Sequence, residues 1–65
     1  MKEPIESFAV GDPVQNTQQV SYYYQKVGRV SAVVTLKSRT SLTVNYDDGS
    51  SETFKGKKVW LRKVS

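Results

Sequence analysis

The chain has 65 residues and contains neither cysteine nor histidine, which excludes disulfide bonds, thiolate or imidazole metal ligands and the usual nucleophile–base pairs of enzymes. We therefore expect one small domain without catalytic residues, a metal, a cofactor or a small-molecule substrate. Basic residues number 10 against 6 acidic ones, and the formal net charge of +4 favours polyanionic partners such as nucleic acid.

The N-terminal segment carries no periodic apolar pattern and contains Pro4, so residues 1–7 are expected to form a flexible tail before a domain at residues 8–65. It also lacks the apolar stretch of a signal peptide, and the longest aliphatic run, residues 32–34, is far shorter than a membrane span. We therefore expect a cytoplasmic protein without a membrane partner, located at the nucleoid or in the nucleus if it binds nucleic acid.

From Phe8 onward, the sequence predicts short strands separated by turns. Phe8, Val10 and Val14 alternate in the first strand, although Pro13 requires an edge, a bulge or a turn there. Residues 16–26 are polar and predict a loop with an aromatic end. The clearest strand follows, because one of its faces is apolar and the other polar, with Val33 as an exception on the polar face. Its apolar face comprises Val30, Ala32, Val34 and Leu36.

The second half of the chain repeats the alternation at residues 42–46. Asp48-Gly49 is a strong signal for a two-residue hairpin turn, after which residues 51–55 run back. Residues 56–59 predict a single 3₁₀ turn, and residues 60–64 predict a last short strand. Five short strands without helical periodicity predict a small all-β barrel.

The order of these signals resembles the SH3-like barrels of the Tudor, Agenet and KOW types, and the C-terminal barrel of some DNA helicases. The resemblance extends from Phe8 to Val64 and is carried by residues 10–14 (VGDPV), 28–30 (GRV), 42–49 (LTVNYDDG) and 61–64 (LRKV). It implies a five-stranded SH3-like barrel that acts as a non-catalytic binding module. The KOW and helicase branches bind nucleic acid or protein.

Low-specificity nucleic-acid binding is the first functional prediction. Its basis is a group of basic residues in the last strand pair, where no acid follows Glu52 to offset their charge. Three consecutive tyrosines would stack on unpaired bases, since neighbouring rings on an extended chain face opposite ways and at least one is exposed. The prediction requires lysines and tyrosines to share one outer wall of the barrel. In the alternative interpretation, the basic residues are simply a solvated face, and the tyrosines cover the open end of the barrel. The predicted phosphate contacts are Lys55, Lys57, Lys58, Arg62 and Lys63, with Arg29 and Lys37 in support, and the stacking residues are Tyr22, Tyr23 and Tyr24.

A protein-interaction module is the alternative prediction. Tyr46 and Asp48 stand where Tudor domains that read methylated peptides have an aromatic residue and a turn acid, which the resemblance associates with peptide binding. A peptide, or a second copy of the chain, would then contact Tyr22, Tyr24, Tyr46, Asp48 and Trp60. Trp60 alternatively belongs to the barrel wall, because tryptophan usually contributes a large buried area.

Overall fold

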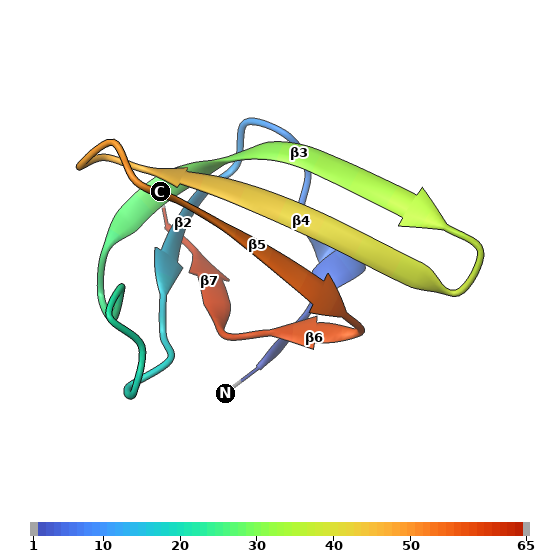
Figure 1. Ribbon diagram of the computed structural model, residues 1–65, viewed down its shortest axis with the longest axis horizontal. Coiled ribbons are helices and arrows are strands. Elements are labelled where there is room, and N and C mark those ends of the chain that lie inside the picture. Colours follow the sequence, from blue (N-terminus) through green and yellow to red (C-terminus); the bar gives the residue numbers. More distant parts are fainter. Residues whose placement is uncertain (1, 65) are drawn as a thin grey trace.

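The structure is a computed structural model that describes residues 2–64. Within this range, the strands form two antiparallel sheets, and one short 3₁₀ helix accompanies them (Figure 1). The elements are β1 (Glu3–Pro4), η1 (Ile5–Ser7), β2 (Pro13–Asn16), β3 (Val27–Leu36), β4 (Arg39–Tyr46), β5 (Ser51–Gly56), β6 (Lys58–Val59) and β7 (Leu61–Lys63). The large sheet has the order β5-β4-β3-β2-β7, and β1 pairs with β6 in a sheet of their own.

The all-β class is confirmed, but hydrogen bonds do not close the large sheet into a barrel. β2 lies between β3 and β7, whereas β5 and β7 are the two edges of the sheet and do not pair with each other within residues 2–64. The strand between them in sequence, β6, pairs with β1 instead, in the register Glu3↔Val59. The large sheet therefore has two free edges, and the β1–β6 pair lies beside them (Figure 1).

The expected flexible tail at residues 1–7 is wrong for the part that the structure describes. β1 pairs with β6, the backbone N–H of Ile5 donates to the carbonyl of Lys57 at 2.9 Å, and the Ile5 side chain is only 2% exposed. A segment with a single inward-facing residue shows no periodicity, which explains the error. Met1 of this tail and Ser65 of the expected domain lie outside the described residues.

One apolar cluster holds the two sheets together, because β1 and β6 share no backbone pairing with the large sheet. Its members come from both sheets and from η1, so apolar packing holds together two sheets that are not joined by backbone hydrogen bonds. Burying a side chain of this type contributes about 1.5–3 kcal/mol relative to leaving it exposed. Among the described residues, the cluster comprises Ile5, Phe8, Val14, Val30, Leu42, Val44, Tyr46, Val59 and Leu61, with Tyr23, Val33 and Phe54 packed against it.

A β-bulge in β3 changes which valines face this core. Ser31 is an extra residue between two successive pairs of β3 with β4, so the register shifts there. Beyond the bulge Val33 packs against the core, whereas Val34 is 49% and Leu36 69% exposed. The predicted apolar face is therefore wrong after Val30, because counting by alternation does not register an inserted residue.

Turn signals mark the positions of loops but not their lengths. Four residues, 47–50, connect β4 and β5, where a two-residue turn was predicted. Gly49 has φ +91°, and the Asp48 carboxylate accepts a hydrogen bond from the backbone N–H of Ser50 at 3.0 Å. Instead of the predicted 3₁₀ turn at residues 56–59, Lys58–Val59 forms strand β6.

Candidate functional site

The three tyrosines lie in the loop between β2 and β3, residues 17–26, which is a series of turns rather than an extended strand. Tyr22 is 83% and Tyr24 40% exposed, which confirms that at least one ring is open to solvent. Tyr23 instead packs on the core and stacks on Tyr46, with ring centroids 4.9 Å apart and planes at 12°. Tyr22 contacts Tyr23 edge to face at 5.3 Å, so the aromatic residues continue from the core to the surface.

Lys26 ties this tyrosine loop to the β4–β5 loop. Its Nζ forms an ion pair with Asp48 and lies 5.3 Å from the ring centroid of Tyr22. Hydrogen bonds from Lys26 and Ser50 hold the pKa of Asp48 well below its ordinary range, and the bond with Asp48 raises the pKa of Lys26. The acid that was predicted to receive a peptide is therefore engaged by a lysine of the same chain.

Tyr46, another predicted peptide contact, is buried and only 4% exposed. Its hydroxyl donates to Glu52 Oε1 at 2.7 Å and accepts from Asn16 Nδ2 at 3.1 Å. Burial raises the pKa of the Tyr46 hydroxyl well above its ordinary range, which keeps it a neutral donor. The arrangement closes one end of the core and leaves no surface of Tyr46 for a ligand.

Three of the predicted phosphate contacts already have partners within the chain. Arg29, Arg62 and Lys63 lie on neighbouring strands around β2, where their side chains contact other groups of the first half of the chain. Their partners are the Gly11 carbonyl (3.0 Å), the Gln15 side-chain oxygen (2.9 Å) and the Asp12 carboxylate (3.6 Å), in that order.

Three other predicted residues, Lys37, Lys57 and Lys58, line a hollow of about 630 Å³ under the β3–β4 hairpin, which we call the basic hollow. Within residues 2–64, none of them takes part in an ion pair. Lys55 does not line the hollow and lies opposite Ser41 in the sheet. The remaining lining residues are Pro4, Ile5, Glu6, Thr35, Ser38, Thr40 and Gly56.

The tyrosine loop and the β3–β4 hairpin lie toward opposite ends of the molecule (Figure 1). The reason is the length of β3: the tyrosines precede its first residue, Lys37 follows its last, and ten extended residues span about 30 Å. The predicted single wall carrying both lysines and tyrosines is therefore wrong. The form of nucleic-acid binding that required this wall fails with it, so any binding by the lysines must occur without stacking on Tyr22, Tyr23 and Tyr24.

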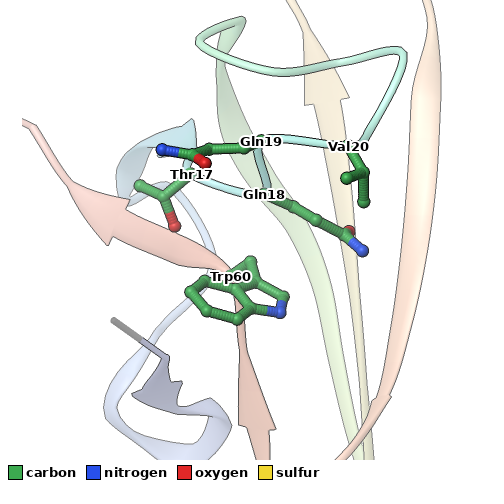
Figure 2. A pocket seen from close by; sticks show the side chains of 5 residues that line it. All are labelled: Thr17, Gln18, Gln19, Val20 and Trp60. Carbon is green, nitrogen blue, oxygen red and sulfur yellow. The ribbon is translucent and has the colours of Figure 1, made fainter.

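Trp60 lies between β6 and β7 and is half-buried, outside the core cluster. It lines a second hollow of about 400 Å³, the tryptophan hollow, whose other side is formed by residues 17–20 (Figure 2). The backbone N–H of Thr17 donates to the carbonyl of Trp60 at 2.9 Å and fixes the loop beside the ring. Sequence reasoning missed Thr17, Gln18, Gln19 and Val20, which carry no motif and lie at least forty positions before Trp60 along the chain.

Comparisons of the chain with protein families, curated proteins and solved structures return no match. Residues 2–64 contain no helix that is long and apolar enough to cross a membrane. The same residues include no cluster of three or more histidine, cysteine or acidic side chains placed to hold a metal ion. The functional argument therefore depends on the geometry of the two hollows and the tyrosine loop.

Proposed function

We propose that the chain is a non-catalytic module of the SH3-like, Tudor/KOW type that binds nucleic acid with low sequence specificity through the basic hollow. The strand order supports the fold, because β2 lies between β3 and β7 and the small curved sheet surrounds a single core, as in partly open barrels. One observation carries the function: three lysines that form no ion pair within residues 2–64 line the same hollow in a protein of net charge +4.

The three lysines line the hollow from two segments that are far apart in the sequence. The concentration of positive charge in the hollow therefore depends on the folded structure. Lys37 occupies the β3–β4 turn with φ +52°, whereas Lys57 lies in the bend before β6 and Lys58 begins that strand. Each ammonium group can neutralise one phosphate and release a counterion. Among the described residues, the hollow is lined by neither arginine nor amide side chains, whose planar, fixed donors and acceptors match base edges most selectively. Low specificity follows from this chemistry.

Three phosphate contacts define the expected salt dependence. The slope of log affinity against log salt is about −2.7 for a duplex and about −2.1 for a single strand. Affinity should therefore fall about 20- to 40-fold between about 50 mM and about 200 mM salt. A much flatter dependence would contradict binding through these lysines.

The test is a fluorescence-anisotropy titration of labelled single- and double-stranded oligonucleotides at the two salt concentrations. Replacing the three lysines of the hollow together by glutamine, K37Q/K57Q/K58Q, should abolish most of the binding. The matched control, R29Q/R62Q/K63Q, removes the same charge elsewhere and should retain it, and circular dichroism checks that both variants fold. Equal losses would show a response to net charge alone, and undetectable binding of the unmodified protein at low salt would remove the proposed function.

Glu6 provides a test in the opposite direction. It is exposed and, in the part of the chain that the structure describes, is the only acid that lines the basic hollow. E6Q removes a negative charge beside the three lysines, so oligonucleotide affinity should rise several-fold at low salt and less at high salt. Unchanged affinity at low salt would indicate that the strand binds elsewhere.

Protein interaction is the second candidate function, and a specific observation favours it. Val20 is 90% and Tyr22 83% exposed on the tyrosine loop, and protruding apolar and aromatic side chains commonly anchor interfaces. Among the predicted peptide contacts, Tyr24 and Trp60 are also partly accessible. Light scattering at increasing protein concentration tests self-association, which V20S/Y22S should abolish. A monomer at all concentrations would restrict this function to a different partner.

A further inference from the structure

The tryptophan hollow has the chemistry of a site for a flat ring with hydrogen-bonding edges. Trp60 supplies an aromatic surface, and Gln18 and Gln19 supply amides that donate and accept. Among residues 2–64, the side-chain amides of these two glutamines form no hydrogen bond. The backbone N–H of Gln18 donates to Asn16 Oδ1 at 2.8 Å, and its backbone carbonyl accepts from the N–H of Ser21 at 2.9 Å. Figure 2 shows the Gln18 side chain extending along the loop side of the indole.

Thr17 provides a second, independent indication of a ligand. Its Oγ1 is buried and has no hydrogen-bond partner among the described residues. Figure 2 shows this oxygen turned toward Trp60, on the inner side of the hollow. Buried hydroxyl groups in native proteins are nearly always paired, so an unpaired one directed into a hollow points to a polar atom that a ligand supplies.

The two hollows take lining residues from the same stretch of chain, since Lys58 of β6 lines the basic hollow and Trp60 the tryptophan hollow. Lys58 and Trp60 flank the buried Val59; Lys58 is exposed, and Trp60, in the bend after β6, is half-buried. The Nζ of Lys2, the residue before β1, lies 5.7 Å from the ring centroid of Trp60. Positive charge therefore lies against the aromatic ring at Lys2 and two residues before it in the chain at Lys58.

We propose that the tryptophan hollow receives one unpaired base of a nucleic-acid strand, stacked on Trp60 and hydrogen-bonded at its edge by Gln18 and Thr17. Phosphates on either side of this base contact Lys58 and Lys2. The inference rests on the proposed nucleic-acid binding and deepens it, because stacking selects unpaired strands whereas charge alone does not. A glutamine amide matches the adjacent donor and acceptor of adenine, which makes adenine the base to test.

The chain contains a single tryptophan, so fluorescence excited at a wavelength that its four tyrosines do not absorb reports on this hollow alone. The full chain is titrated with a short oligodeoxyadenylate and, as a matched control, with an abasic sugar–phosphate strand of the same length. Anisotropy of a label on each strand measures binding separately. The oligodeoxyadenylate should bind and quench Trp60, whereas the abasic strand should bind more weakly and leave the fluorescence unchanged.

Two substitutions locate the base. Loss of one stacked base lowers affinity about 5- to 150-fold, which is the effect expected for W60A on the oligodeoxyadenylate. Since Trp60 is half-buried and W60A can affect folding, Q18A serves as the second variant. It should weaken oligodeoxyadenylate binding several-fold and leave binding of the abasic strand unchanged.

Each outcome separates this inference from the function on which it rests. If the oligodeoxyadenylate binds while Trp60 fluorescence stays constant, or Q18A affects both strands equally, the base site is overturned and the proposed function stands. If neither strand binds at low salt, both are overturned. Quenching by a proline-rich peptide but not by the oligodeoxyadenylate would assign the hollow to a protein ligand and also overturn the inference.

Discussion

Replacing Gly28 by alanine is expected to unfold a large part of the protein population, because the added methyl group has no room between β3 and β4. Gly28 pairs with Tyr46, and a Cβ at this position would lie 2.3 Å from the carbonyl oxygen of Asn45 and 2.7 Å from the Cα of Tyr46. Non-bonded carbon atoms normally approach to about 3.5–4.0 Å, so the strands would have to separate by roughly 1 Å. The obstructing atoms belong to the backbone, and no side-chain rotation can relieve the contact.

The expected cost follows from this geometry. Overpacking of a tight site costs about 1–3 kcal/mol. Separation of the strands also weakens neighbouring backbone hydrogen bonds, such as the one from the N–H of Asp47 to the carbonyl of Val27 (2.9 Å), each of which contributes about 1 kcal/mol. The total loss is about 3–5 kcal/mol, against a free energy of unfolding of about 3–10 kcal/mol for a domain of 65 residues.

Urea denaturation followed by circular dichroism measures this loss, and G11A is the matched control. Gly11 has φ +94° but no atom within 4 Å of an added Cβ, so alanine there costs only the strain of a left-handed backbone, about 1–2 kcal/mol. Equal losses of unfolding free energy in the two variants would refute the close approach of β3 and β4 at Gly28.

Two further predictions concern the polar contacts near the tyrosine loop. Y46F removes the buried hydroxyl that donates to Glu52 and should lower the free energy of unfolding by about 1–3 kcal/mol in urea; unchanged stability would show that this hydrogen bond is not formed. Because the pKa of Asp48 is lowered in the folded state, its pairing with Lys26 stabilises the protein above the unfolded-state pKa of about 3.9 and is lost as the pH falls through the folded-state pKa. D48N should therefore flatten the acid side of a Tm–pH profile, and an equally steep profile in D48N would argue against the ion pair.

Strand prediction succeeded where the sheet is regular and failed where it is not. In β4, alternation correctly placed Leu42, Val44 and Tyr46 in the core, because no residue is inserted there. In β3, the extra residue Ser31 reversed the faces beyond it. The local sequence contains no marker for that bulge, whose position is set by pairing with β4.

In the candidate site, too, features that depend on neighbouring residues could be predicted, whereas contacts between residues far apart in the sequence could not. Exposure of a tyrosine ring could be predicted from three adjacent tyrosines, because they cannot all enter one core. That Tyr23 would stack on Tyr46 could not, because the two residues meet only when the β2–β3 loop folds back against the end of β4. Likewise, Ile5 reaches the core through β1–β6 pairing, which nothing in the first seven residues indicates.

The amino-acid sequence alone determined the chemistry that is available: a net positive charge, no thiol or imidazole, and alternating patterns with turn residues that specify an all-β chain. These properties are sums or local patterns and do not depend on which residues meet in space. Only the tertiary structure decided that Lys37 joins Lys57 and Lys58 in one hollow, and that Trp60 faces residues 17–20 in another. Binding surfaces combine residues from distant parts of the chain, and the pairing and curvature of the sheets set the distances between those residues.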